Sequence, residues 1–259
     1  MGTTLLEAIL EPGSLTPMFQ PIFNLGGIGL KLHSYECLTR GPRGTSAESA
    51  AVMFEYVRRK REEVSVDRAC VQTAMQAAAL LPSEPCISVN VHVRTLVRDR
   101  DFVSDLLRMA EENSIAPWRL TVELIEHMCP CDVQNLWRAL DELRTAGLRL
   151  ALDDVGSGQS NYSMILDCQP DALKVDAYVV QGCHADKHRV AALESIVALA
   201  RTFDSQVIAE GIQEPADLDT VLGLGINLGQ GFMLGKPMSI QTLLKRSQSF
   251  VAPMACARA

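Results

Sequence analysis

The sequence predicts an α/β protein built as a (β/α)8 barrel of the TIM type, in which an early strand can run antiparallel to the others. Short apolar runs alternate with longer segments of helical spacing almost without exception, which is typical of parallel strands joined by helices. The number of repeats in 259 residues suits one closed barrel. An open, doubly wound sheet is the second choice, because no glycine-rich dinucleotide fingerprint follows an early strand.

The chain is predicted to form a single domain over residues 1–259, with a core from about 16 to 246, because no linker rich in Pro, Gly or Ser divides it. With 47% hydrophobic residues it can bury a full core. Its net charge of −7 offers no electrostatic footprint for duplex nucleic acid. No signal peptide and no membrane-spanning apolar run are recognised, so the cytoplasm is the expected location.

The eight cysteines show no spacing typical of a disulfide framework, and reduced, buried thiols are expected. Cys129 and Cys131 are the one close pair. Without a second pair at ligand spacing, a zinc site is not expected there.

The first third of the chain is predicted to hold a short helix, a hairpin and a long helical segment. A strand beginning at Thr16 is followed by Gly26 and Gly27, which turn the chain back into a second strand. The next segment has apolar residues at helical spacing, and its charged patch over 58–63 fits a solvated helix face. The predicted bounds are 5–11 for the helix, 16–24 and 30–37 for the strands, and 45–81 for the helical segment.

The rest of the chain repeats a strand followed by a helix. Each predicted strand is a short apolar run, and the helices show the wider apolar spacing of a half-buried surface. The predicted strands are 86–90, 120–123, 149–153, 172–176, 206–210 and one near 227–229. The predicted helices are 102–113, 133–145, one near 160–167, 187–203 and 214–224.

Polar side chains end nearly every predicted strand. They are Glu36, Asn90, Glu123, Asp153, Asp154, Lys174, Asp176 and Glu210. In a barrel the carboxyl ends of the strands converge on one mouth. Carboxylates gathered there repel one another unless cations neutralise them, and their hard oxygen atoms suit Mg²⁺ or Mn²⁺. The strand ends therefore predict a divalent metal site.

Asp153 and Asp154 are adjacent, so on a regular strand their side chains point to opposite faces. They can reach a common ion only if the backbone turns there, which Gly156 and Gly158 permit. Taken alone, the pair is better explained by an aspartate that caps the following helix. The carboxylates at the other strand ends favour the metal site.

These strand ends resemble the motifs of the EAL-domain cyclic di-GMP phosphodiesterases, from about Met18 to Met238. Each motif is weak alone, but eight in order at successive strand ends make a specific resemblance. They are Gln20-Pro21-Ile22, Glu36-Cys37-Leu38-Thr39-Arg40, Ser88-Val89-Asn90, Glu123-Leu124-Ile125-Glu126, Asp153-Asp154-Val155-Gly156-Ser157-Gly158, Leu173-Lys174-Val175-Asp176, Ala209-Glu210-Gly211, and Gln230-Gly231 through Lys236-Pro237.

The resemblance implies hydrolysis of cyclic di-GMP to linear pGpG with two Mg²⁺ or Mn²⁺ ions, in a protein that forms a homodimer. The implied ligands are Glu36, Asn90, Glu123 and Asp153 for one ion, and Asp153, Asp154 and Glu210 for the other. Paired ions of this kind activate water and clamp a phosphodiester.

The resemblance also implies roles for other side chains. Lys174 would steady the water or the developing phosphorane charge. Glu210 is the family's candidate for proton transfer, but metal binding comes first because a bound carboxylate is a poor base. The implied catalytic residues are Lys174, Glu210 and Glu36; Gln20, Arg40 and Gln230 would bind the substrate; Glu126, Asp176 and Gln213 would support the site and its loop.

Five positions depart from the family pattern: Cys37, His92, Val155, Gln159 and Gln213. Val155 and Gln159 predict looser packing of the loop after Asp154. Gln213 removes a carboxylate, and His92 is expected to be a packing residue rather than a ligand. The alternative function is therefore a catalytically weak or inactive cyclic di-GMP receptor that signals through a protein partner, with a pure interaction scaffold as a third possibility.

Overall fold

A computed structural model describes residues 3–82, 85–125, 132–157 and 162–250. Within these residues the strands β1 to β8 close a barrel, because β1 pairs with β8 on one side and β2 on the other. Strands β2 to β8 are parallel to one another, and β1 runs antiparallel to both neighbours. The predicted barrel and its antiparallel early strand are confirmed, and the open sheet is wrong.

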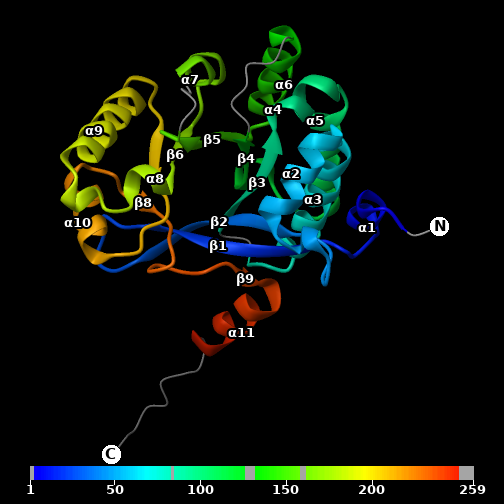
Figure 1. The fold of residues 1–259 in the computed structure, drawn as a ribbon, viewed down its shortest axis with the longest axis horizontal. Coiled ribbons are helices and arrows are strands. Elements are labelled where there is room, and N and C mark those ends of the chain that lie inside the picture. The colour runs from blue at the N-terminus through cyan, green and yellow to red at the C-terminus, as the bar shows by residue number, and fades with distance from the viewer. Residues whose placement is uncertain (1–2, 83–84, 126–131, 158–161, 251–259) are drawn as a thin grey trace, which may run out of the picture.

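The strands follow the predicted order around the barrel (Figure 1). They are β1 (Thr16–Asn24), β2 (Lys31–Arg40), β3 (Cys86–His92), β4 (Leu120–Ile125), β5 (Arg149–Val155), β6 (Ala172–Val175), β7 (Gln206–Ala209) and β8 (Leu228–Gly229). A further strand, β9 (Met238–Ser239), pairs with β1 and was missed because two residues carry no periodicity.

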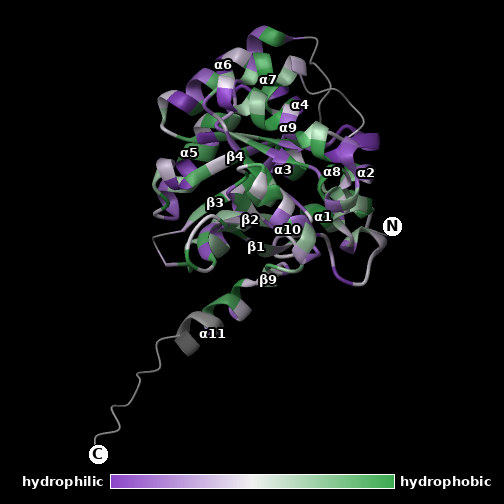
Figure 2. Ribbon diagram, turned by 90° about the vertical axis from the view of Figure 1, so that its left-hand side faces the viewer, coloured by the Kyte–Doolittle hydropathy of each residue, from purple (hydrophilic) through white to green (hydrophobic). Residues whose placement is uncertain are grey.

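Most helices surround the barrel, whereas α11 extends away from it (Figures 1 and 2). Figure 2 shows that the helices carry both hydrophilic and hydrophobic residues, as half-buried helices do. They are α1 (Leu5–Leu10), α2 (Ala50–Lys60), α3 (Glu63–Ala78), α4 (Val93–Arg98), α5 (Phe102–Glu112), α6 (Val133–Thr145), α7 (Tyr162–Cys168), α8 (Ala177–Val180), α9 (Lys187–Thr202), α10 (Pro215–Gly223) and α11 (Ile240–Phe250). Short 3₁₀ turns are η1 (Ser46–Glu48), η2 (Pro117–Arg119) and η3 (Cys183–Ala185). Within the described residues, none of these helices has the length and apolar character needed to cross a membrane.

The long segment 45–81 divides into two helices at Arg61. This residue takes a left-handed conformation, with φ of 61°, so α2 ends there and α3 begins two residues later. Its charged patch is partly solvated as expected, but Glu63 is buried and lies 3.5 Å from Arg94. The helices α4, α8 and α11 were not predicted. The first two are less than two turns long, which leaves little periodicity to detect.

Asp67 fastens α3 to the junction of β3 and α4. Its carboxylate accepts hydrogen bonds from the backbone N–H of His92 at 2.9 Å and from the Thr95 hydroxyl at 2.6 Å, and it lies 2.8 Å from Nδ1 of His92. All three residues are almost fully buried. The His92 ring also packs on Phe54 of α2, with ring centroids 5.7 Å apart, so His92 is a packing residue.

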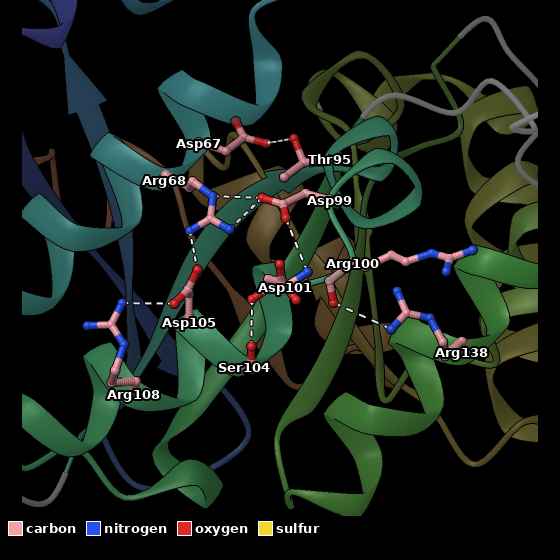
Figure 3. Close-up of polar contacts among 10 residues, drawn as sticks. All are labelled: Asp67, Arg68, Thr95, Asp99, Arg100, Asp101, Ser104, Asp105, Arg108 and Arg138. Atoms are coloured by element: carbon pink, nitrogen blue, oxygen red, sulfur yellow. Dashed lines mark hydrogen bonds and ion pairs between the residues drawn. The ribbon is translucent and has the colours of Figure 1, made fainter.

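The next residue on α3, Arg68, makes a second link to the same region (Figure 3). Its guanidinium bonds to Asp99, at 2.6 Å, and to Asp105. Asp99 ends α4 and Asp105 lies in the first turn of α5. Neighbouring residues of α3 therefore hold the two helices that follow β3.

Replacing Asp67 with alanine should lower the free energy of unfolding by about 3 kcal/mol, because three buried donors then lose their acceptor. Urea unfolding followed by circular dichroism would measure this. Asp219→Ala, at an exposed position of α10, is the matched control and should change little. A loss below 1 kcal/mol for Asp67→Ala would show that the link is not important for stability.

Candidate metal centre

The predicted site residues lie within or directly after successive strands, and β2 continues four residues beyond Glu36. Glu36 is on β2 and Glu123 on β4, Lys174 is on β6, and Glu210 directly follows β7. The parallel register places Asn90 of β3 opposite Glu123. Because the strands are parallel, these side chains gather at the same end of the barrel.

Two groups of carboxylates have ligand atoms close enough to share an ion. Glu36, Glu123 and Asp153 form one group, and Asp153, Asp154 and Glu210 form the other, with the ligand atoms of each group within 4.8 Å of one another. Asp153 belongs to both. These are the two carboxylate sets expected for the two ions.

The backbone turn that brings Asp153 and Asp154 to one side is present. Asp154 has a φ of 53°, in the left-handed region, and the β5–β6 register shifts between Leu152 and Val155. Gly156 follows with a φ of 96°, and an added Cβ there would lie 2.7 Å from Val179. Val155 is buried, and its carbonyl accepts the N–H of Asp176 at 3.0 Å. The loop is therefore tied to β6 as far as the described residues extend.

Lys174 lies among four of the carboxylates. Its Nζ is 2.6 Å from Glu123, 2.9 Å from Glu210, 3.0 Å from Asp153 and 3.3 Å from Glu36. The side chain is almost fully buried. A buried ammonium stays charged only when negative groups pair with it, and here residues on or next to four strands supply those groups.

The pKa values follow from this crowding. Burial opposes the charged form of Lys174, but the four carboxylates outweigh it and hold its pKa well above the ordinary value. Burial raises the pKa of Glu123 to about 8, against the attraction of Lys174 and together with repulsion from Glu36. Burial and the charge of Asp153 raise the pKa of Asp154 to about 6. A cation that entered the site would displace these protons.

The donor set fits a hard divalent cation. Asn90 donates Nδ2 to Glu36 at 3.2 Å, while its Oδ1 is buried without a hydrogen-bond partner among the described residues. Burying an amide oxygen without a hydrogen-bond partner costs free energy unless a bound group, such as a metal ion, interacts with it. Carboxylate and amide oxygens without a thiolate are the ligands that Mg²⁺ and Mn²⁺ prefer.

Gln230, expected to bind substrate, contacts the carboxylates themselves. Its Nε2 lies 2.8 Å from Glu36 and 2.8 Å from Glu210, so it bridges one residue of each carboxylate group. Gln20 donates instead to the carbonyl of Gly235, at 3.1 Å. Arg40 is half-buried at the end of β2. The structure thus gives Gln230 a positioning role that the motif did not indicate.

Of the residues expected to support the site and its loop, Asp176 lies next to the carboxylates, whereas Gln213 is exposed at the surface. Asp176 caps α8 by accepting the N–H of Tyr178 at 2.8 Å, and its proximity contributes to the raised pKa of Asp154. Glu126, Gln159, Cys129 and Cys131 lie outside the described residues, as does Gly158.

A cavity of about 220 Å³ opens beside the first carboxylate group. Glu36, Asn90 and Asp153 line its polar end. Residues of α2 and α3, several of them small, line part of the rest. Its other lining residues include Ala50, Ala51, Phe54, Cys70 and Ala74. Sequence reasoning missed this wall, because α2 and α3 lie outside the strand-end motifs and only their packing reveals it.

A third group of ligand-type side chains, His184, Glu214 and Asp217, lies where η3 meets α10. The carboxylate of Asp217 already accepts the N–H groups of Gly182 at 3.0 Å and His184 at 3.3 Å, and Nδ1 of His184 is 2.7 Å away. Burial raises the pKa of Asp217, but these hydrogen bonds outweigh it and the net pKa is lowered. This group is explained as a fastening between η3 and α10.

Comparison with known proteins identifies the fold family. The sequence model of the EAL domain matches residues 3–237, nearly the whole chain. The chain belongs to the EAL domain family.

Proteins of known name resemble the chain over part of their length. The blue light- and temperature-regulated antirepressor BluF of Escherichia coli is 28% identical over 160 residues, which are 62% of this chain and 40% of BluF. MucR of Pseudomonas aeruginosa, a bifunctional diguanylate cyclase/cyclic di-GMP phosphodiesterase, is 31% identical over 132 residues, 51% of this chain and 19% of MucR. The chain therefore spans less than half of either relative.

A solved EAL structure supports the same fold. BlrP1 of Klebsiella pneumoniae, solved as a complex with manganese and cyclic di-GMP, superposes with a TM-score of 0.78 at 26% identity. The match covers 90% of this chain and 58% of BlrP1. The EAL domain described here thus has the barrel of a protein that was solved with both a divalent metal and the cyclic dinucleotide.

Proposed function

We propose that this EAL domain is a metal-dependent phosphodiesterase that hydrolyses cyclic di-GMP to linear pGpG. The observation that carries the proposal is the pair of carboxylate groups that share Asp153 at the barrel mouth. The family membership and the presence of cyclic di-GMP in the BlrP1 structure support the choice of substrate.

The residues that would hold two Mg²⁺ or Mn²⁺ ions are Glu36, Asn90, Glu123, Asp153, Asp154 and Glu210. Such ions supply a water of lowered pKa and neutralise the charge of the phosphodiester. Gln230 keeps Glu36 and Glu210 in register through its two hydrogen bonds. Glu210 acts first as a ligand in this scheme.

The remaining side chains bind and orient the substrate. Lys174, fixed and buried, stabilises negative charge that develops on the phosphorus centre, as a preorganised cation does in a site closed to water. Arg40 and the buried Gln20 bind the phosphate and guanine groups. The cavity beside Asn90 provides room for an uncharged part of the nucleotide.

The domain organisation, the oligomeric state and the cellular location are also part of this proposal. Residues 1–259 act as one EAL unit, and the family resemblance supports a homodimer. The described cysteines 37, 70, 86, 168 and 183 are free thiols, which suits the reducing cytoplasm.

A second candidate is a receptor that binds cyclic di-GMP without efficient hydrolysis and signals through a protein partner. The similarity to BluF, named an antirepressor, favours it. The retention of every carboxylate in the two groups, and of Lys174, favours the enzyme.

Hydrolysis of cyclic di-GMP by the purified protein, with chromatography for pGpG, tests the proposal. We expect pGpG to appear with Mg²⁺ or Mn²⁺ and to stop when a chelator removes the metal. Binding of the nucleotide by calorimetry without any product would instead support the receptor. Neither product nor binding at millimolar metal would contradict both.

A further inference from the structure

Lys174 stands where the carboxylates of the two groups meet, and this position has consequences beyond steadying charge during hydrolysis. Its Nζ contacts Glu36 and Glu123 of the first group, Glu210 of the second, and Asp153, which the groups share. The four distances, 2.6 to 3.3 Å, are those of direct ion pairs. Each partner comes from a different strand or strand end.

We propose that Lys174 is a built-in counter-ion that holds the carboxylates together without metal and opposes the binding of divalent cations. The inference rests on the proposed metal site, but it concerns metal affinity rather than hydrolysis. It identifies Lys174 as a positioning residue that sets how much free cation the domain needs.

The electrostatic argument has two parts. Without a cation, four carboxylates packed in a buried space repel one another, and the ammonium offsets much of that repulsion. With a divalent cation among the same oxygens, the ammonium lies close to a second positive charge and repels it. Both effects weaken metal binding, so the removal of Lys174 should strengthen it.

A purely structural role makes the opposite prediction. If Lys174 served only to hold Glu36, Glu123 and Asp153 in the right geometry, its loss would disorder these ligands and weaken metal binding. The sign of the change in affinity therefore distinguishes the two roles, whatever the effect on catalysis.

The test uses the whole chain without nucleotide. Lys174→Met removes the ammonium with little change of shape, and Lys174→Gln keeps a hydrogen-bond donor without the charge. Lys187→Met, at an exposed position of α9, is the matched control. Each protein is stripped with a chelator, titrated with Mn²⁺ by calorimetry, and melted with and without saturating Mn²⁺.

We expect both Lys174 variants to melt about 5 °C or more below the unsubstituted protein without metal. They should bind Mn²⁺ at least about tenfold more tightly, which is the factor that 1.4 kcal/mol represents. Saturating Mn²⁺ should restore much of the lost melting temperature, because the cation replaces the ammonium. Lys187→Met should behave as the unsubstituted protein does.

Equal or weaker Mn²⁺ binding by the Lys174 variants would overturn the inference and leave the proposed function standing. Variants that stay unfolded at every Mn²⁺ concentration would also overturn it, since the cation would then fail to replace the ammonium. An unsubstituted protein that binds no Mn²⁺ would instead overturn the proposed metal site, and this inference with it.

Discussion

Replacing Asp153 with asparagine should reduce metal-dependent hydrolysis of cyclic di-GMP by on the order of a thousandfold. Asp153 is the residue common to both carboxylate groups, so one substitution weakens both ion sites. Asparagine keeps the size of the side chain but removes the negative charge, and the fold should survive. Initial rates of pGpG formation at saturating Mn²⁺ would measure the loss.

Asp219→Asn is the matched control, because it makes the same chemical change at an exposed position of α10. Its rate should equal that of the unsubstituted protein. A rate for Asp153→Asn above a tenth of the original would show that the shared carboxylate is not central to the reaction, and the two-ion arrangement would have to be abandoned.

Gly231→Ala should damage both stability and activity, because the backbone of Ile212 lies against this glycine. An added Cβ would be 2.1 Å from the Ile212 carbonyl oxygen and 2.3 Å from its nitrogen. The N–H of Ile212 donates to the carbonyl of Gln230 at 3.0 Å, so the segments that carry Glu210 and Gln230 must separate. We expect a loss of about 3 kcal/mol in the free energy of unfolding.

Activity should fall with it, since Gln230 would no longer reach Glu36 and Glu210 together. Urea unfolding and initial rates of the same preparations would record both effects. Gly223→Ala tests a helical glycine with open space around it and should stabilise the protein by up to about 1 kcal/mol. Equal stability of the two variants would refute the steric argument.

The sequence predicted the strands of the barrel well because their apolar runs and polar ends repeat regularly. It placed Glu36, Glu123, Asp153 and Glu210 together by one rule, that parallel strands end at the same mouth. Elements only about one period long, such as β9 and α8, gave no such signal.

Contacts between distant segments could not be predicted in the same way. Asp67 and His92 are an ordinary helix residue and an ordinary strand residue until the fold brings them within 2.8 Å. The double hydrogen bond of Gln230 depends on the side-chain orientation after β8, which no periodicity encodes. The sequence predicted a backbone turn at Asp153 and Asp154 only as a requirement for both carboxylates to reach one ion, and the left-handed φ of Asp154 provides that turn.

The antiparallel strand β1 also determines where the barrel can open. It meets β2 along its whole length, and Gln20 and Glu36 face each other in a hairpin between near neighbours in the chain. It meets β8 through two residue pairs, Phe23 with Gly229 and Asn24 with Leu228, from opposite ends of the sequence. Because closing a long-range join costs more chain entropy than closing a hairpin, we expect this join to form after the hairpin during folding.

The same join should open in the native state more readily than the hairpin, because two residue pairs hold it whereas nine hold β1 to β2. Gln230 follows β8 directly and its N–H donates to the carbonyl of Ala209 on β7, so a local opening between β1 and β8 would separate Gln230 from Glu36 while its bond to Glu210 stayed. In a hydrogen-exchange experiment the amides around Gly229 would then exchange faster than those of β3 and β4. Each such opening would remove the hydrogen bond that links the two carboxylate groups through Gln230.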